Sequence, residues 1–470
     1  MNLTPQQQTI LDHILVTPGL TMIEAKAGTG KTTMLTSIAS ALNPTSALYI
    51  CYNKSVATEA SHKFPKSVHC CTTHSLAYKP TVVEHKLKLG TFTSKSISEL
   101  STFDHRQEVV DTFRQFCLSS YTSFSDFSSD NALAPHLAPL VEKYFKLMES
   151  AKIECTHEFY LKYFHLLLAA GSITYPTFDL VMLDEAGDLN EVTLEIFKLL
   201  PATRKVMVGD PYQNIYTFNH TINCFELMAD QGSIFPMSQS FRVADHIATR
   251  IESFGRKYLS PSFSFEGVPV KSSTITTRAF ISRTNAALIA KMMELNSDGI
   301  PYGLTRKAKQ IFELPLAFCS LRYQGFIPLP EYKWLQADVD HYFEDTHLRA
   351  EYGSLFNYLR NIHSDDLTLV KTINLIQRYG KASIISCYEE ARKHEKSCQS
   401  LTLGTCHSCK GLEFDEVEIA DDLNEAIIDP INILTLKPTA VLSTEHLAEL
   451  YLYYVACSRS KHKLVNAIHL

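Results

Sequence analysis

The sequence of 470 residues lacks three features that would place it in common classes of protein. No run of about 18 apolar residues is present, so we expect no membrane-spanning helix. The first residues lack the basic and then apolar pattern of a signal peptide, which predicts a soluble protein of the cytoplasm or nucleus that is not secreted. The 44 basic residues are outnumbered by 50 acidic ones, so the composition gives no general support for nucleic-acid binding.

A zinc-type set of cysteines is absent as well. Twelve cysteines in a chain without a signal sequence indicate reduced thiols in an intracellular compartment. Cys406 and Cys409 form a CxxC pair, but no second pair accompanies it, and we expect no metal there. The length predicts two to four domains, because single hydrophobic cores stop growing near roughly 250–300 residues.

A glycine-rich loop follows a short apolar segment near the start of the chain. Residues 20–24 form a strand-like run, the loop spans residues 25–32, and apolar residues then recur at helical spacing. This order is the context of a P-loop, where backbone N–H groups surround phosphate oxygens. Lys31 is predicted to reach the β- and γ-phosphates, and Thr32 to ligate Mg²⁺. The residues predicted to bind ATP here are Ala25, Lys26, Ala27, Gly28, Thr29, Gly30, Lys31, Thr32 and Thr33.

Two further apolar runs end in polar residues, as expected for strands whose carboxyl ends meet at one edge of a parallel sheet. Residues 180–183 lead into Asp184 and Glu185. Asp184 is predicted to hold Mg²⁺ through its water shell, and Glu185 to orient or deprotonate the attacking water. Residues 206–208 lead toward Gln213, whose amide we expect to sense the γ-phosphate.

Beyond the P-loop, the chain resembles the UvrD-like branch of superfamily 1 helicases over nearly its whole length. Seven segments resemble motifs of that family and occur in the same order, which is far more specific than any single motif. They are residues 3–7, 49–54, 72–76, 208–216, 238–242, 405–414 and 454–460. The first resembles the Q motif, and the resemblance implies that Gln7 contacts adenine.

Within this branch, three segments are most similar in wording to the F-box DNA helicase family, although no F-box is visible. They are residues 52–55, 156–162 and 240–242. We expect a phage or viral member of the group. The resemblance implies an α/β fold with two RecA-like P-loop domains, each with a parallel sheet and each interrupted by an inserted, mainly helical subdomain. The expected ranges are 1–78 and 152–225 for the first domain, 79–151 for its insertion, 226–304 and 397–470 for the second domain, and 305–396 for a smaller insertion.

In the family, the two domains bind ATP between them, and the second supplies arginines that neutralise charge on the γ-phosphate. The resemblance gives this role to Arg242 and Arg459, an effect of roughly 10³–10⁵-fold in other NTPases. It also implies that Phe241 stacks on adenine and that Glu413 contacts the ribose. The alternatives are a surface salt bridge for each arginine and a core position for Phe241.

Aromatic residues are candidates for gripping single-stranded DNA. Tyr216 and Phe218 lie two residues apart, so an extended segment would place both rings on one side. Base stacking contributes about 1–3 kcal/mol per base and tolerates any sequence, which suits a translocase. Tyr52 and His74 are further candidates, and a core position is the alternative for all four. By resemblance, the DNA-contacting residues of segment 405–414 are Thr405 and His407.

Two positions depart from the family pattern. Where the second helicase motif normally has a glutamine, this chain has Gly187, and in relatives the missing side chain helps to couple the ATP site to the DNA path. Thr33 stands where many UvrD-like motors have an arginine that packs on adenine. We expect weaker coupling but intact ATP binding, and Gly187→Gln is the corresponding test.

The sequence as a whole predicts an ATP-dependent single-stranded DNA translocase and helicase, moving 3′ to 5′ and acting in replication, repair or recombination. Its partners would be single-stranded DNA and junctions of single- and double-stranded DNA, bound by a monomer, with ATP and Mg²⁺ as cofactors. An ATP-gated protein that remodels DNA filaments without unwinding is the alternative that Gly187 motivates. A P-loop kinase or signalling NTPase would not explain the segments that contain Arg242 and Arg459.

Overall fold

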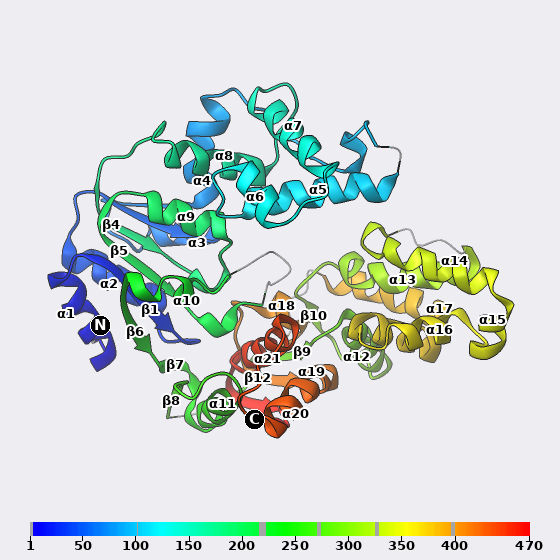
Figure 1. Ribbon diagram of the computed structural model, residues 1–470. Helices are drawn as coiled ribbons and strands as arrows, with labels where there is room; N and C mark the ends of the chain where they lie inside the picture. Colours follow the sequence, from blue (N-terminus) through cyan, green and yellow to red (C-terminus); the bar gives the residue numbers. More distant parts are fainter. Residues whose placement is uncertain (1–2, 101, 216–221, 270–273, 325–328, 396–399) are drawn as a thin grey trace. The chain divides into compact units, whose positions relative to one another are not determined.

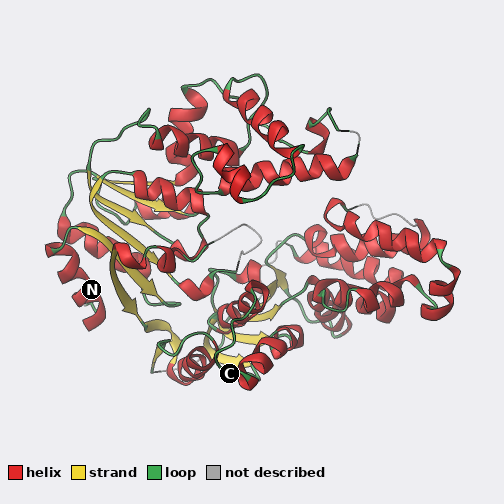
Figure 2. Cartoon of the chain, in the orientation of Figure 1, coloured by secondary structure: helices red, strands yellow, loops and turns green. Residues whose placement is uncertain are grey.

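The computed structural model describes residues 3–100, 102–215, 222–269, 274–324, 329–395 and 400–470. The chain divides into two compact units, Met1–Gln239 and Ser240–Leu470. Each unit contains a parallel sheet with helices packed around it (Figure 2). This arrangement confirms the predicted α/β class with two parallel-sheet domains. Within the described residues, no helix combines the length and the apolar character that crossing a membrane requires.

The first unit contains a six-stranded sheet in which all neighbouring strands are parallel (Figure 1). Its order is β3 (Val68–Thr72), β2 (Ala47–Cys51), β4 (Phe178–Leu183), β5 (Ala202–Gly209), β1 (Gly19–Ala25) and β6 (Gly232–Met237). All five residues of β2 are buried, as expected for a strand covered on both faces. Parallel pairing brings the carboxyl ends to one edge, where the polar motif residues follow.

The helices of the first unit fall into two groups. The sheet is accompanied by α1 (Pro5–Val16), α2 (Lys31–Leu42), α3 (Lys54–Ser61), α4 (Thr73–Tyr78), α9 (Glu191–Leu199) and α10 (Cys224–Leu227). Between α4 and β4 the chain forms α5 (Phe103–Leu118), α6 (Phe124–Asp130), α7 (Leu137–Glu149) and α8 (His157–Ala169). These inserted helices share one apolar core with the sheet, since Phe113 and Phe159 belong to the same buried cluster as Val181.

The first sheet extends further along the chain than the sequence analysis proposed. Strand β6 pairs with β1 in parallel, from Leu20 opposite Gly232 to Ala25 opposite Met237. Residues 226–239 therefore lie in the first unit, whereas the predicted boundary assigned them to the second domain. The strand signal of this segment is weak because Pro236 cannot donate a ladder hydrogen bond, and prolines are confined to edge strands such as β6.

The second unit has a five-stranded parallel sheet. Its order is β10 (Gly303–Leu304), β11 (Leu401–Thr405), β9 (Arg278–Ser282), β12 (Phe414–Ile419) and β13 (Ser460–Val465). A two-stranded sheet of β7 (Gln239–Ala244) and β8 (Glu266–Val268) precedes it. The helices near these sheets are α11 (Asp245–Tyr258), α12 (Asn285–Ser297), α18 (Cys406–Cys409), α19 (Asp421–Ala426), α20 (Ile428–Leu436) and α21 (Thr444–Cys457).

A helical insertion also interrupts the second sheet, between β10 and β11. It contains α13 (Ala308–Gln324), α14 (Gln336–Glu344), α15 (Thr346–Tyr352), α16 (Leu355–Ile362) and α17 (Leu367–His394). Helix α17 is kinked at Gly380, whose φ of 73° lies in the left-handed region that glycine tolerates. Ile373 and Ile289 belong to one buried cluster, so the insertion shares its core with α12.

Candidate nucleotide and DNA sites

The P-loop connects the carboxyl end of β1 to the first residue of α2. Gly28 and Gly30 have φ angles of 74° and 84°, which side chains with a Cβ rarely adopt. Gly30 is the N-cap of α2, so the loop delivers free backbone N–H groups and the positive end of the helix to one place. This local geometry is suited to a polyphosphate.

Three charged side chains meet beside the P-loop. Lys31 Nζ lies 3.2 Å from Glu185 Oε2. Burial disfavours the charged amine, but the carboxylates of Glu185, Asp184 and Asp210 outweigh it and raise the pKa of Lys31. Asp184 is buried at the end of β4 and accepts hydrogen bonds from Tyr49 Oη at 2.6 Å and from the Glu185 N–H at 2.8 Å.

Asp184 and Glu185 concentrate negative charge at the strand end. Burial, followed by the neighbouring Glu185 carboxylate, raises the pKa of Asp184 to about 6. An ionised carboxylate can accept about four hydrogen bonds or ligand contacts, so Asp184 retains capacity beyond its two protein donors. Thr32, in the first turn of α2, carries a further hydroxyl oxygen. Oxygen donors in a region of concentrated negative charge fit Mg²⁺, which prefers hard oxygen ligands.

The turn after β5 brings a third motif next to the P-loop. Asp210 is fully buried and begins a short 3-10 turn at Pro211–Gln213. One carboxylate oxygen accepts from Gln213 Nε2 at 2.8 Å, and the other accepts from the Tyr212 N–H at 3.2 Å. The amine of Lys26 lies 3.9 Å from the same carboxylate. Gln213, the predicted phosphate sensor, is therefore held by the turn that contains it.

Gln7 lies against the P-loop backbone in the protein interior. Its Nε2 donates to the carbonyl of Thr29 at 3.2 Å, and its Oε1 accepts from the Thr4 N–H at 3.0 Å. Thr4 in turn caps α1 by accepting from the Gln7 N–H, which completes a capping box. The structure thus gives Gln7 a direct contact with the phosphate loop, and its contact with adenine stays a prediction.

The environment of Gly187 gives a steric reason for a glycine at this position, and the weaker coupling expected from the sequence stays a prediction. Gly187 is buried in a short 3-10 turn after β4, and a Cβ built on it would lie 2.5 Å from the carbonyl oxygen of Asp210. A Cβ on Gly209 would lie 2.7 Å from the Gly187 nitrogen. The two turns therefore pack backbone against backbone, and a glutamine side chain has no room here. Gly187→Gln, the test of coupling, would therefore also overpack this close approach.

The candidate DNA contacts in the first unit follow β2 and β3. Tyr52 comes directly after β2 and is 63% exposed. His74, in the first turn of α4, is exposed and packs edge-on against Tyr160 with ring centroids 5.7 Å apart. Although the residue is exposed overall, neighbouring groups partly desolvate its ring, and this desolvation, followed by the nearby His157, lowers the pKa of His74 and favours the neutral ring. Tyr216 and Phe218 lie outside the described residues.

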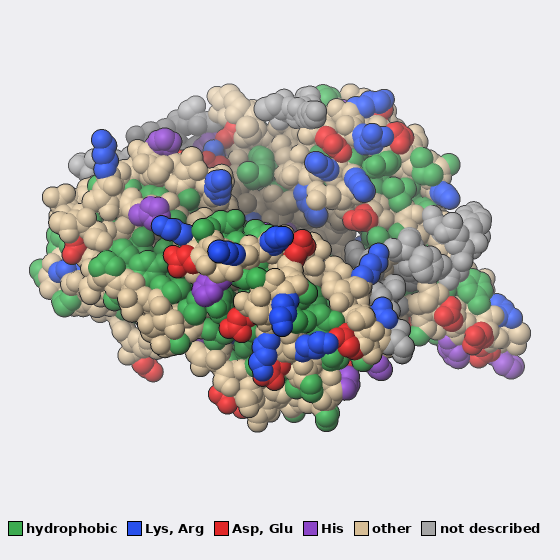
Figure 3. Space-filling view, turned by 90° about the horizontal axis from the view of Figure 1, so that it is seen from above, with side chains coloured by type: hydrophobic (Ala, Val, Ile, Leu, Met, Phe, Trp, Pro, Cys, Tyr) green, Lys and Arg blue, Asp and Glu red, His purple; other side chains and the backbone are tan. Residues whose placement is uncertain are grey.

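Charge on the molecular surface is mixed. On the face shown in Figure 3, Lys and Arg side chains are interspersed with Asp and Glu, in keeping with the net charge of −6. Exposed rings such as Tyr52 are therefore more informative about a nucleic-acid contact than this charge pattern.

In the second unit, the charged side chains predicted to contact ATP form ion pairs or hydrogen bonds with other residues of the same unit. Arg242 Nε forms an ion pair with Glu413, and Lys461 Nζ lies 3.3 Å from the other oxygen of that carboxylate. Arg459 is only 3% exposed, and Nε donates to the carbonyl of Val455 at 3.0 Å. Nη2 of the same guanidinium group donates to Ser458 Oγ at 3.0 Å.

The remaining predicted residues of this unit differ in exposure. Phe241 is 53% exposed, which excludes the core position considered from the sequence. Thr405 is buried as the residue before α18, and His407 is half-buried within that helix. Cys406 and Cys409 are buried thiols, and burial raises the pKa of Cys409 to about 12.

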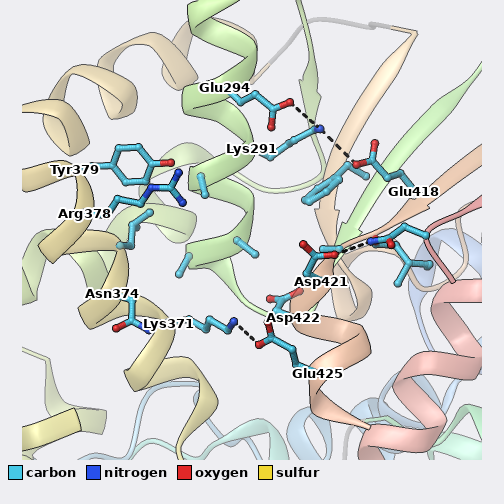
Figure 4. A pocket seen from close by; sticks show the side chains of 18 residues that line it. Lys291, Glu294, Lys371, Asn374, Arg378, Tyr379, Glu418, Asp421, Asp422 and Glu425 are labelled. Atoms are coloured by element: carbon cyan, nitrogen blue, oxygen red, sulfur yellow. Dashed lines mark hydrogen bonds and ion pairs between the residues drawn. The ribbon is translucent and has the colours of Figure 1, made fainter. Parts of the chain in front are cut away.

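A separate cavity of about 730 Å³ lies in the second unit, between α12, α17 and the end of β12 (Figure 4). Lys291 contacts Glu294 at 3.3 Å and Glu418 at 3.4 Å, and Lys371 is paired with Glu425. None of the residues predicted from the sequence to bind ATP or DNA lines it. Its charged side chains pair with one another where the helical insertion meets the sheet, and this structural role accounts for them.

Comparison with known proteins supports the motif assignment. Residues 7–219 match the AAA domain family. The chain is 25% identical to F-box DNA helicase 1 of Gallus gallus over 98% of its own length and 48% of that protein. It is 22% identical to F-box DNA helicase protein 1 of Schizosaccharomyces pombe, over 98% of its own length and 57% of that protein. Protein R568 of Acanthamoeba polyphaga mimivirus is 28% identical over 60% of this chain and 33% of its own.

These similarities confirm the resemblance predicted from the seven segments. The AAA domain is of the type found in UvrD-like superfamily 1 helicases, and the F-box DNA helicases match along nearly the whole chain. The chain spans about half the length of the two F-box helicases, at 48% and 57%.

Proposed function

We propose that this chain, whose AAA domain is typical of UvrD-like superfamily 1 helicases, is an ATP-driven DNA helicase that moves along single-stranded DNA. The observation that carries the proposal is the convergence of Lys31, Asp184 and Glu185 at one edge of the first sheet, beside a glycine loop shaped for phosphate.

The roles of these side chains follow from their chemistry. The backbone N–H groups of the P-loop would hold the phosphates, and Lys31 would neutralise charge on the outer ones. Its present partner, Glu185, would be released in exchange and become available to orient or deprotonate water. Thr32 and Asp184 would hold Mg²⁺, which supplies charge neutralisation between phosphate oxygens. Gln213 would contact the γ-phosphate or the attacking water through its amide.

The second unit contributes the arginines in this proposal. Arg242 and Arg459 would act on the developing charge of the γ-phosphate, with Phe241 on the adenine and Glu413 on the ribose. Arg242 would exchange Glu413 for phosphate, and Arg459 would leave the carbonyl of Val455. Because these exchanges depend on bound nucleotide, hydrolysis would be tied to a conformational step of the protein.

Single-stranded DNA is the proposed track. Tyr52 has the exposure that stacking on a base requires, and His74, Thr405 and His407 are proposed as further contacts. Movement from 3′ to 5′, action at junctions as a monomer, and a role in replication, repair or recombination complete the proposal by analogy with the UvrD-like branch.

Hydrolysis of ATP measured with and without single-stranded DNA tests the proposal. The rate should rise strongly with DNA, and Lys31→Ala should abolish it while circular dichroism stays unchanged. Lys198→Ala is the matched control, since this lysine lies on α9 and pairs only with Glu195 among the contacts described. A rate indifferent to DNA, or persistent turnover in Lys31→Ala, would contradict the proposal.

Duplexes with a 3′ or a 5′ single-stranded tail separate unwinding from DNA-stimulated hydrolysis. Unwinding only from the 3′ tail is the expected result. Stimulated hydrolysis without unwinding of either substrate would favour the ATP-gated protein that remodels DNA filaments. Unwinding only from the 5′ tail would overturn the proposed polarity and leave the helicase assignment in place.

A further inference from the structure

Lys26, the P-loop residue that directly follows β1, is a buried lysine whose side chain has no role in the proposed mechanism. Only 5% of the residue's surface is exposed to solvent. The backbone is held on both sides, because its N–H donates to the carbonyl of Met237 at 3.0 Å and its carbonyl accepts from Thr29 Oγ1 at 2.9 Å. The side chain therefore has a fixed origin and extends into the interior rather than toward solvent.

The amine of Lys26 ends beside the turn that contains the phosphate sensor. Nζ lies 3.9 Å from Asp210 Oδ1 and 4.2 Å above the centre of the Tyr212 ring. Lys26 directly follows β1, and Asp210 directly follows β5. The two strands are paired in register, with Glu24 opposite Gly209. An aromatic face and a carboxylate together form a site for a desolvated cation.

We propose that Lys26 is a positioning residue for ATP hydrolysis, which holds the Asp210 carboxylate in place and so fixes the orientation of the Gln213 amide. This inference rests on the proposed function, in which Gln213 contacts the γ-phosphate or the attacking water.

The orientation argument follows from donors and acceptors. An ionised carboxylate can only accept, so its 2.8 Å bond to Gln213 uses the Nε2 end of the amide. The Oε1 end is then directed away from Asp210. The position of the Asp210 carboxylate thus determines where the other end of the Gln213 amide points.

Burying a carboxylate without a nearby cation is very costly, because the unpaired charge loses its hydration. The amine of Lys26 lies within ion-pair distance of Asp210, and Lys31 also interacts electrostatically with this carboxylate. The dependence is mutual: burial lowers the pKa of Lys26, and the carboxylates of Asp210 and Glu24 oppose that shift. The ion pair of Lys26 and Asp210 therefore connects the P-loop directly to the turn after β5.

Steady-state hydrolysis by single and double variants tests the inference. Lys26→Met keeps the length of the side chain and removes its charge, and Gln213→Ala removes the amide that is being oriented. Each should lower kcat by roughly 10- to 100-fold, the usual effect of losing a group that orients a catalytic side chain. The KM for ATP should change little. Because both changes act through the same amide, the double variant should be no slower than the slower single variant.

The matched control is Lys205→Met. Lys205 lies on β5, the strand that ends at the Asp210 turn, and its amine is also partly buried over an aromatic ring, Phe197, at 5.5 Å. It donates to the carbonyl of Lys198, and the contacts described for it do not include Asp210. Its kcat should equal that of the wild type.

The outcomes separate the possibilities. A wild-type kcat in Lys26→Met, or multiplicative losses in the double variant, would overturn the positioning role. A raised KM with unchanged kcat would assign Lys26 to nucleotide binding instead, and also overturn it. If Lys26→Met does not fold, Asp210→Asn is measured in its place, and failure of both to fold would assign the pair to stability alone. An inactive wild type would refute the proposed function itself, before any variant is compared.

Discussion

A single methyl group at position 187 should destabilise the first unit and disturb the ATP site. In Gly187→Ala, the new Cβ would lie 2.5 Å from the carbonyl oxygen of Asp210, whereas ordinary contacts begin at 3.4 Å. The oxygen would have to retreat by about 0.9 Å, and it belongs to backbone rather than to a flexible side chain. Overpacking of this kind costs about 1–3 kcal/mol. Since the displaced residue is Asp210, the Gln213 amide should move with it and hydrolysis should fall.

Urea denaturation of Gly187→Ala and of a control separates this contact from ordinary backbone effects. Gly171→Ala is suitable because a Cβ there meets nothing within 4 Å, although its φ of 67° is left-handed. That control should lose about 1–2 kcal/mol from backbone strain alone and keep its rate of hydrolysis. Gly187→Ala should lose both stability and rate, and Gly187→Gln should lose more of each. An alanine variant as stable and active as the wild type, or a glutamine variant that unwinds more DNA per ATP, would refute the reasoning.

Two other predictions concern DNA binding and pH. Tyr52→Ala should weaken binding of single-stranded DNA by about 1–3 kcal/mol through the loss of one stacking ring, as measured by fluorescence anisotropy. Phe343→Ala, a comparably exposed ring on α14, should leave affinity unchanged, and equal effects of the two would contradict the assignment. Burial lowers the pKa of the Lys162 amine to about 8 from an ordinary value of 10.5. Between about pH 8 and 10.5, the amine is therefore protonated in the unfolded chain and neutral in the folded chain. The stability of the wild type relative to Lys162→Met should therefore rise between pH 8 and 10.5, and a flat difference in urea denaturation would contradict the shift.

The parts of the site that depend on short segments could be predicted from the sequence. The P-loop needs only a strand, two glycines with positive φ and a helix, and all of these lie within residues 19–42. The Asp184 and Glu185 pair follows an apolar run that already indicates a buried parallel strand. Parallel pairing then forces the carboxyl ends of these strands to one edge, so their proximity is a consequence of topology.

Contacts between distant segments could not be predicted in the same way. The Lys26 and Asp210 pair depends on β1 and β5 being neighbours in register, which no local pattern specifies. From the sequence, Gly187 is a position where a side chain present in relatives is missing. The sequence does not show that the Asp210 carbonyl oxygen approaches the backbone there. The end of the first unit was also misplaced, since an edge strand that contains Pro236 has a weak strand signal.

The charged groups assigned to ATP are all paired with protein before any nucleotide is present. Lys31 contacts Glu185, Arg242 contacts Glu413, and Arg459 donates to carbonyl and hydroxyl oxygens of its own unit. An unpaired charge in these partly buried positions would be costly, so each group needs a partner in the free protein. Under the proposed function, ATP binding is consequently an exchange of partners, and its net free energy is smaller than the new contacts alone would suggest. Under the same proposal, the phosphate would take Lys31 from Glu185, and this carboxylate would then be better placed to orient or deprotonate water after ATP has bound.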